Sequence, residues 1–429
     1  MNRESLQGRS PAETRLKLVA FALLLSEFVR SLGYNLYSIS LPIIAQQLAE
    51  SAILTGIAVS IFGFVQSTAQ IPLGRYSDKH GRKGILLISA LIYASGALLV
   101  GFAQDIFQFI LFRAIQATGA VMSVLQACLG DIFPRERRGT AMAWFSIVYA
   151  IGTIVGLPLG GVVAGIFGLR MPFYLCALLS FISFIILILF LRETLPSKVQ
   201  VAAASDTATG LVTSVAAQTA YALEGVCEPE EKGLKPKGEG LLKTRGFVQA
   251  CIIGMALSST IGSFFAFAPL FLESLGYTVL DMGLIFIPGI AIFFGGSFFS
   301  GMASDRIGRR IPVITGLSIA VPFAFLVLFI SSSLRVPAVM LFLLGVAVCQ
   351  PPLSALVIDL VSKEVRGKAA GFYNTLTVFG TAIGALIAGF IIQSYGLTSM
   401  FVLSGILVTI SLIIGLIYLP KGKPRREGV

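Results

Sequence analysis

The segment that decides the fold is GRYSDKHGRK at residues 74–83, because it returns as GMASDRIGRR at residues 301–310. Both glycines, the aspartate and the closing basic pair keep their spacing across an offset of 227 residues, a little over half of the chain. Further pairs repeat at an offset of 228 residues: Asp131 returns as Asp359, and Gly152 returns as Gly380. Self-similarity at a fixed period indicates that one structural unit is duplicated in the same orientation.

The composition places most of this chain in a membrane. Hydrophobic residues make up 56% of the 429 residues and charged residues only 12%, whereas a soluble domain carries about 25% charge. A helix needs about 20 apolar residues to cross the hydrocarbon core. We therefore expect an all-α membrane protein with twelve transmembrane helices, arranged as two six-helix bundles in a parallel pseudo-repeat. The expected spans are 18–44, 54–74, 84–103, 106–133, 140–167, 171–191, 247–272, 282–303, 312–331, 336–361, 369–393 and 398–419.

The positions of lysine and arginine predict how these helices are oriented. If the N-terminus is cytoplasmic, 28 of the 32 Lys and Arg residues fall in inside segments, and only Arg170 and Arg335 fall in outside loops. Cytoplasmic loops carry such an excess of positive charge, so both termini are expected in the cytoplasm. The net charge of +11 then reflects loops that face anionic lipid headgroups, and no nucleic-acid partner is expected.

Composition also divides the chain into three parts: an N-terminal six-helix bundle (1–193), a cytoplasmic linker loop (194–245) and a C-terminal six-helix bundle (246–429). The linker composition is typical of a mobile tether, with a short interfacial helix near 209–224 as the alternative. Four of the five cysteines fall in expected helices, and the single histidine, His80, falls in a loop. No disulfide framework, metal site or His-based catalytic site is expected, so the chain should not be an enzyme.

The doubled unit and its motifs resemble the major facilitator superfamily, in which two six-helix units in parallel orientation form one transporter. The repeated loop is similar to that family's signature loop between helices 2 and 3. The stretch from Arg113 to Gly119 resembles the helix-4 motif of proton-driven members, although Ala117 stands where a glycine is usual. Helix 5 resembles the antiporter motif with its proline one place late, through Gly152, Gly156, Pro158, Gly160 and Gly161. The resemblance implies a drug:proton antiporter.

The repeated loop is expected to form a gate at the cytoplasmic surface. A carboxylate at the end of helix 2 can cap the positive N-terminal end of a neighbouring helix, which contributes about 0.3–1 kcal/mol. The resemblance implies that this neighbour is helix 11, which starts near Lys368. The alternative is a tight turn that only marks topology. The gating residues are Gly74, Asp78, Gly81, Arg82 and Lys83, with Gly301, Asp305, Gly308 and Arg309 in the second copy.

Helix 1 carries charges that the helical rise places near the middle of the membrane. Glu27 and Arg30 are three residues apart and share one face, and Arg113 lies at comparable depth in helix 4. Such charges are costly in lipid and mark pathways or proton relays. We expect these three residues to couple transport to the proton gradient, because a moving positive charge changes the proton affinity of a buried carboxyl group. The alternative is a fixed Glu27–Arg30 pair that only orders the core.

The substrate cavity is expected between the two halves. Because no charge is expected deep in the second half, a charged wall would face an apolar, aromatic wall, and this suits export of lipophilic and amphipathic small molecules. Two arginines against one glutamate leave the site net positive, so a sugar or an organic anion is the alternative substrate. The expected cavity residues are Tyr34, Tyr37, Gln70, Gln116, Ser258, Ser259, Phe264, Gln350 and Asn374.

Helices 2, 5, 8 and 11 are expected to form sliding seams between the halves, because small residues let helices approach closely. The helix-5 glycines 152, 156 and 160 are expected to meet those of helix 8 at 295, 296 and 301. We expect a monomeric, multi-pass protein of the plasma (inner) membrane whose partners are lipid, protons and a small-molecule substrate. It should use the proton gradient and no cofactor. A membrane-embedded enzyme or receptor is disfavoured, because the sequence shows no catalytic cluster and no sizeable soluble domain.

Overall fold

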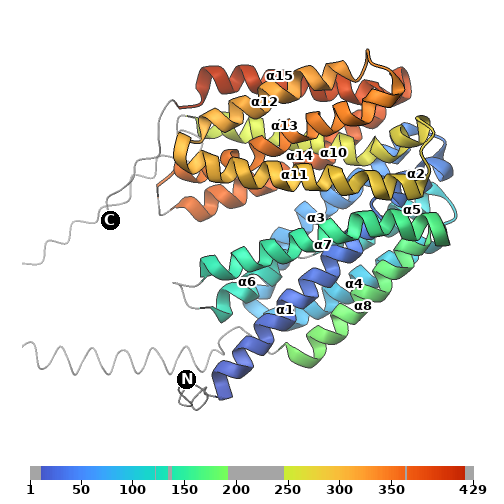
Figure 1. Cartoon of the computed structure of the whole chain (residues 1–429). Helices are drawn as coiled ribbons and strands as arrows, with labels where there is room; N and C mark the ends of the chain where they lie inside the picture. Colours follow the sequence, from blue (N-terminus) through green and yellow to red (C-terminus); the bar gives the residue numbers. More distant parts are fainter. Residues whose placement is uncertain (1–10, 121, 134–137, 192–245, 363–364, 421–429) are drawn as a thin grey trace, which may run out of the picture.

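The computed structural model of the chain describes residues 11–120, 122–133, 138–191, 246–362 and 365–420. All the regular secondary structure in these ranges is helical. Helices α1–α8 form one bundle and helices α10–α15 form a second (Figure 1). The predicted linker at 194–245 lies outside the described residues.

The first bundle follows the predicted spans, with two of them broken. The break after α1 precedes Pro42, which lies in the first turn of α2 where its missing N–H removes no hydrogen bond. At the break after α5, a side chain on Gly119 would collide with the backbone of Tyr93 on α4, so this close approach requires glycine. The helices are α1 (Pro11–Leu36), α2 (Ser40–Ala49), α3 (Ala52–His80), α4 (Arg82–Phe102), α5 (Ile106–Thr118), α6 (Met122–Ile132), α7 (Arg138–Phe167) and α8 (Met171–Phe190).

The second bundle consists of unbroken helices. The N-terminus of α11 has a capping box, in which the backbone N–H of Thr278 donates to Asp281 at 2.9 Å and the Thr278 hydroxyl accepts from the Asp281 N–H. The helices are α10 (Phe247–Ser274), α11 (Val279–Ile307), α12 (Arg310–Leu326), α13 (Ser332–Asp359), α14 (Arg366–Tyr395) and α15 (Ser399–Tyr418).

The helices are suited to a lipid environment. Eleven helical stretches in the described ranges are long and apolar enough to cross a membrane, when α5 and α6 are taken as one. The remaining apolar helix, α12, is shorter at 17 residues. Large apolar side chains such as Phe107, Phe167, Phe299 and Phe329 remain exposed, as expected of surfaces that contact lipid.

Each bundle packs around its own core. In the first bundle α1 packs against α7 and α8, and in the second α10 packs against α14 and α15. Tyr37 and Phe173 stack at the centre of the first core, with 4.9 Å between ring centroids. A further cluster joins the bundles, because Ile39 and Leu157 of the first half pack with Phe271 and other residues of the second.

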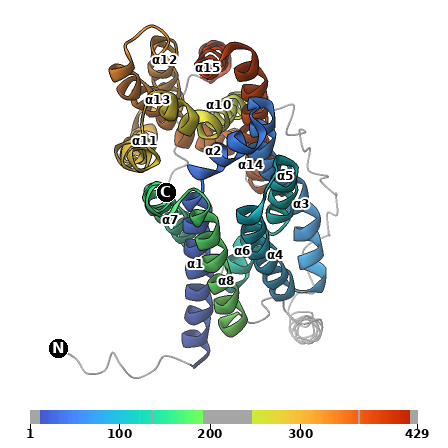
Figure 2. The same cartoon turned by 90° about the vertical axis from the view of Figure 1, so that its right-hand side faces the viewer.

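The bundles meet along two helix pairs, α3 with α14 and α7 with α11, which confirms the predicted seams. The contacts are tight at the end that carries residues 49–51 and 396–398, named here the closed end. At this end the backbone at Gly56 approaches Gly389, and Gly161 approaches Gly283. Figure 2 looks onto the closed end, where α2 lies between the two bundles.

The opposite end of the molecule carries the repeated loops at 80–82 and 308–310 and is named here the motif end. A side chain added at Gly74 on α3 or at Gly371 on α14 would meet no atom within 4 Å. The two bundles therefore touch at the closed end and diverge toward the motif end (Figure 1).

The predicted glycine partners in one seam were wrong. Gly152, Gly156 and Gly160 pack against α1 inside the first bundle, and Gly296 packs against Leu344 on α13 inside the second. Each helical residue is rotated by about 100° from the last, so the seam is made by the neighbouring face of α7. The seam residues are Gly161 and Gly165 on α7, which lie against Gly283 and Leu280 on α11.

Candidate functional site

A cavity of about 370 Å³ lies between the two bundles. Its first-half wall is mostly polar, whereas its second-half wall is aromatic and aliphatic. The first wall contains Tyr34, Asn35, Tyr37, Ser38, Leu41, Pro42, Val59, Arg113, Tyr149, Thr153 and Leu157. The second contains Ile261, Phe264, Phe265, Phe286, Gly289, Ile290, Phe293, Phe294, Leu343 and Thr381.

Helical spacing places these side chains on the cavity. On α7, residues 149, 153 and 157 are four apart and therefore share one face. On α11, residues 286, 290 and 293 are four and three apart and also share one face. Asn35 connects α1 with α7. Its side-chain amide donates to the Thr153 hydroxyl on α7 at 3.1 Å and to the Ser31 carbonyl on α1 at 2.8 Å.

Arg113 is the charged residue of this cavity and is only 2% exposed. Its Nη1 donates to the Tyr37 hydroxyl at 3.0 Å and to Gln116 Oε1 at 2.8 Å. The guanidinium carbon lies 4.5 Å from the ring centre of Phe62, a cation–π distance. Nε of Arg113 and Nε2 of Gln116 are buried without a hydrogen-bond partner, and no carboxylate in the described ranges pairs with the guanidinium.

Glu27 and Arg30 form a two-point ion pair on α1. Arg30 Nη2 lies 2.6 Å from Glu27 Oε1, and Arg30 Nε donates to Glu27 Oε2 at 2.9 Å. Glu27 is fully buried, whereas 16% of the Arg30 side chain is exposed. Both carboxylate oxygens are therefore occupied, and the exposed part of the pair is on the arginine side.

Two tyrosines lie between the ion pair and Arg113. The Tyr37 hydroxyl, which accepts from Arg113, is 3.5 Å from the Tyr93 hydroxyl. Tyr93 and Arg30 line the same small cavity of about 30 Å³ beside the first bundle's core. Arg113 and Glu27 do not contact each other in this conformation. The two tyrosine hydroxyl groups provide a polar connection between them.

The structure brings only some of the predicted cavity residues to the cavity. Tyr34, Tyr37 and Phe264 line it, and Gln116 is buried behind Arg113. Ser258 and Ser259 are buried on α10 but do not line it, and the Ser259 hydroxyl bonds its own helix at Met255. Gln70, Gln350 and Asn374 also lie outside the lining, with Asn374 exposed on α14. A residue on the same helix face as a cavity residue can therefore lie above or below the cavity.

Sequence reasoning missed Asn35, Tyr149 and Thr153 on the polar wall, and Phe286, Phe293 and Phe294 on the apolar wall. The polar pair on α7 had a signal, because Tyr149 and Thr153 are four apart in a mostly apolar helix. The phenylalanines had none, because most of the 33 phenylalanines in this chain look alike in the sequence.

Each repeated loop contains a three-residue charge cluster. Arg82 lies 3.3 Å from Asp78 and 2.6 Å from Asp131, and Arg309 pairs with Asp305 and, at 3.1 Å, with Asp359. Partial burial opposes the charge of Arg309, but its hydrogen bonds with Asp359 and Asp305 raise its pKa above the ordinary value. The third members, Asp131 and Asp359, were missed, although their repeat at 228 residues was visible.

The same loops bring together the other gating residues. Gly81 and Gly308 have φ values of 104° and 92°, a region that side-chain-bearing residues rarely adopt, so the two tight turns require glycine. Asp78 is 61% exposed and points its carboxylate at Arg82 rather than at the start of α14. The predicted contact between Asp78 and helix 11 is therefore not formed while the motif end is open.

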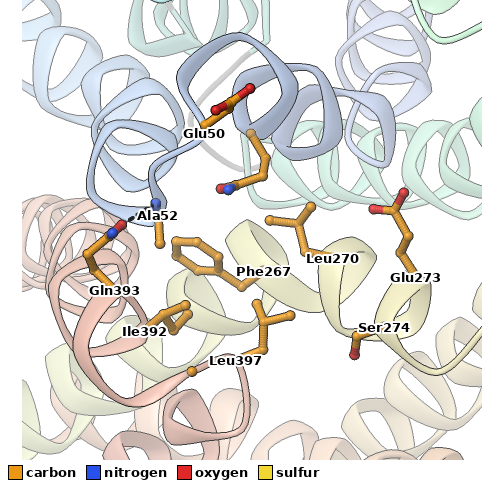
Figure 3. A pocket seen from close by; sticks show the side chains of 11 residues that line it. Glu50, Ala52, Phe267, Leu270, Glu273, Ser274, Ile392, Gln393 and Leu397 are labelled. Carbon is orange, nitrogen blue, oxygen red and sulfur yellow. Dashed lines mark hydrogen bonds between the residues drawn. The ribbon is translucent and has the colours of Figure 1, made fainter.

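A polar contact crosses between the bundles at the closed end. Gln393 Oε1 on α14 accepts from the Ala52 N–H at 2.7 Å and from the Ser51 hydroxyl at 3.3 Å, so it caps the N-terminus of α3. Figure 3 shows this contact beside a surface pocket of about 430 Å³, with the carboxylates of Glu50 and Glu273 at its rim. Sequence reasoning missed Gln393.

The site offers binding rather than covalent chemistry. Among the described residues no group of three or more His, Cys, Asp or Glu side chains could hold a metal ion. Four buried cysteines in the same ranges, Cys128, Cys176, Cys251 and Cys349, are free thiols. The functional groups that face the cavity are hydroxyl, amide, guanidinium and aromatic groups.

Comparison with known proteins gives matches over most of the chain. The model of the Major Facilitator Superfamily matches residues 23–349 and 294–429. The multidrug resistance protein MdtG of Proteus mirabilis is 26% identical over 399 residues, covering 90% of this chain and 92% of that protein. The inner membrane transport protein YajR of Escherichia coli is 32% identical over 130 residues, or 30% of this chain.

Solved structures share the fold. A bacterial homologue of the human lysosomal transporter Spinster, in an inward-facing and unoccupied conformation, gives a TM-score of 0.75 at 17% identity and covers 96% of this chain and 97% of that one. A D-xylose–proton symporter gives a TM-score of 0.72 at 15% identity, with coverage of 95% and 99%. At these identities the likeness concerns the fold.

Proposed function

Because this chain belongs to the Major Facilitator Superfamily, we propose that it exports lipophilic and amphipathic small molecules by alternating access. Membership makes it a multi-pass transporter of the inner membrane and not an enzyme. The printed name of the MdtG relative, a multidrug resistance protein, supports the substrate class of the proposal.

One observation carries this proposal: the cavity between the bundles has a polar wall on one half and an aromatic wall on the other. An amphipathic molecule can satisfy both walls at once, whereas a sugar would leave the phenylalanines of the second wall against polar groups. Predominantly apolar pockets with a few polar groups are typical small-molecule sites.

The proposal includes an orientation. The repeated loops are rich in Lys and Arg, so we place the motif end in the cytoplasm, together with both termini, and count α12 as the twelfth span. In this orientation the conformation described here is open to the cytoplasm and ready to receive substrate. The Gln393 contact and the glycine seams close the outer side.

Proton coupling is assigned to the Glu27–Arg30 pair. When Glu27 binds a proton, its carboxylate loses its negative charge. The positive charge of Arg30 is then left unpaired in the core of the first bundle. This unpaired charge would drive the transporter to open toward the opposite side of the membrane. Glu27 would release its proton there, and the ion pair with Arg30 would form again. Arg113 contributes through Tyr37 and Tyr93, whose hydroxyl groups lie between the two arginines.

The proposal is tested in proteoliposomes that contain the purified protein and carry an imposed pH gradient. The wild-type protein should accumulate lipophilic fluorescent dyes against their gradient, and dissipating the pH gradient should abolish accumulation. Leu343→Trp, which fills the cavity from α13, should block transport. Leu341→Trp is the matched control, because Leu341 is 39% exposed two residues away and does not line the cavity.

The result that would contradict the proposal is failure of the wild-type protein to accumulate any dye, or equal dye transport by the Leu343→Trp variant. Counterflow of a labelled sugar and of a labelled hydrophilic organic anion, which has no apolar body, distinguishes the second candidate. The specific observation in favour of the anion is Arg113, which has no carboxylate partner among the described residues.

A further inference from the structure

We propose that the substrates of this cavity are amphipathic monoanions whose acid group binds the free edge of Arg113 and whose apolar body packs against the second-half phenylalanines. This inference rests on the proposed function, because it names the substrate class of the same cavity. It begins from the charge balance of the first bundle. Glu27 is occupied at both oxygens by Arg30, so this pair is neutral.

Arg113 is the charge that remains uncompensated. It is 2% exposed, and no carboxylate within the described ranges pairs with it. A buried charge without a partner is costly and normally acquires one. A cationic substrate would add repulsion to this cost, whereas an anionic group would remove it.

The guanidinium has donors that no protein group in the described ranges uses. The hydrogen bonds of Arg113 to Tyr37 and Gln116 both use Nη1. Nε is buried without a partner, and Nη2 forms no hydrogen bond in the described part of the chain. Nε–H and Nη2–H are parallel donors that match the two oxygens of a carboxylate. Gln116 Nε2, also buried without a partner, supplies a further free donor one turn away.

The existing contacts orient this free edge. Gln116 and Tyr37 hold Nη1, and Phe62 covers the face of the guanidinium at 4.5 Å. Fixing a long side chain before binding reduces the entropy that the ligand must overcome. The second wall of the cavity can contact the apolar part of the substrate. It is lined by Phe264, Phe286, Phe293 and Phe294.

Binding is measured with three probes that share one apolar body: the acid 1-naphthylacetate, the alcohol 1-naphthylethanol and the amine 1-naphthylethylamine. The purified protein is held in phosphatidylcholine nanodiscs, so that no anionic lipid competes. At neutral pH the acid should bind at least about tenfold more tightly than the alcohol, and the amine should bind most weakly, because charge-assisted hydrogen bonds add to the shared apolar contacts.

Variants separate the head group from the body. Arg113→Met should lower affinity for the acid about ten- to hundredfold and leave the alcohol nearly unchanged, whereas Arg113→Lys should retain part of the preference. Phe293→Ala should weaken all three probes to a similar degree. Arg170→Met is the matched control, because it removes a positive charge at the closed end, outside the cavity, and should preserve the wild-type order.

The inference is overturned if the wild-type protein binds the amine as tightly as the acid or binds no acid, and also if Arg113→Met keeps the preference for the acid. The wild-type comparison needs no variant, so poor folding of Arg113→Met cannot hide a negative result. Transport is scored separately: a clear preference for the acid in binding, without movement of any probe in proteoliposomes, would overturn the proposed function and leave the anion site standing.

Discussion

The two halves of the molecule are built from one repeated unit, but they differ in what they bury. Both halves keep the aspartate–arginine–aspartate cluster at the motif end. The first half buries Glu27 and Arg113, whereas the described polar residues buried in the second are all serines and a threonine. Where the repeat places the counterpart of Arg113, α13 has Met340 and Leu341. Duplication therefore preserved the surface turns, and the interior diverged into a charged wall and an aromatic wall.

The largest expected effect tests the difference between the interiors of the two halves. Arg30→Met leaves the fully buried Glu27 carboxylate without a partner, and we expect it to lower the free energy of unfolding by about 3–5 kcal/mol. Ser258→Ala, at the position that the 228-residue repeat makes equivalent, should cost about 1 kcal/mol or less. Unfolding in mixed micelles, followed by circular dichroism, measures both.

A double variant serves as the control for this prediction. Glu27→Gln combined with Arg30→Met removes both charges of this pair and should recover most of the lost stability, because neither partner is left as an unpaired charge. Equal losses for Arg30→Met and Ser258→Ala would show that the two interiors do not differ in the way described.

The next effect concerns the seams, where the halves differ in polarity. On the repeat, Gln393 and Ala52 correspond to Gly165 and Leu280. The helix α11 caps its own N-terminus with Thr278 and Asp281. In α3 the N-cap Ser51 accepts from the Leu54 N–H at 3.5 Å, and Gln393 of the other half accepts from the Ala52 N–H at 2.7 Å. Gln393→Ala should therefore shift the population toward opening of the closed end by about 2- to 10-fold, the range expected for losing its hydrogen bond with the Ala52 N–H.

Distance distributions between spin labels at Gln104 and Ser333, one on each bundle at the closed end, measure this shift. Ser394→Ala is the matched control, because its hydroxyl bonds only its own helix at Phe390. An unchanged distribution in Gln393→Ala, or an equal change in Ser394→Ala, would remove the capping role.

The smallest expected effect tests the feature that the two halves share, the aspartate–arginine–aspartate cluster. Arg82→Met and Arg309→Met each break a partly exposed cluster, and each should lower the free energy of unfolding by about 1 kcal/mol or less. The two losses should be similar, because each cluster joins one arginine to two aspartates at equivalent positions of the repeat. Thermal unfolding in matched detergent measures the pair, and a difference of several kcal/mol would show that the repeated clusters are not equivalent.

The sequence predicted the features that depend on local pattern. Apolar length gave the helix positions, and the repeat gave the two bundles. It did not predict that Gly161 rather than Gly160 faces the seam, because one residue of rotation decides this. The Arg82–Asp131 pair joins residues that are 49 apart, and the Gln393–Ala52 contact joins residues 341 apart, so each exists only once the helices are packed.

For the site, the depth of charged residues in a helix predicted Glu27, Arg30 and Arg113 as interior charges. The sequence did not predict that Glu27 and Arg113 are separated by Tyr37 and Tyr93. Their separation depends on how α1, α4 and α5 pack, which is a property of the bundle rather than of any one helix.

The measurement that tests the central claim most directly is pH-gradient-driven export by Glu27→Gln in proteoliposomes. Glutamine can still accept a hydrogen bond from Arg30 but cannot carry an exchangeable acidic proton, so the protein should fold, exchange substrate in counterflow and lose gradient-driven export. Glu273→Gln, which changes an exposed carboxylate at the closed end, should export at the wild-type rate. Gradient-driven export by Glu27→Gln at the wild-type rate would contradict the account.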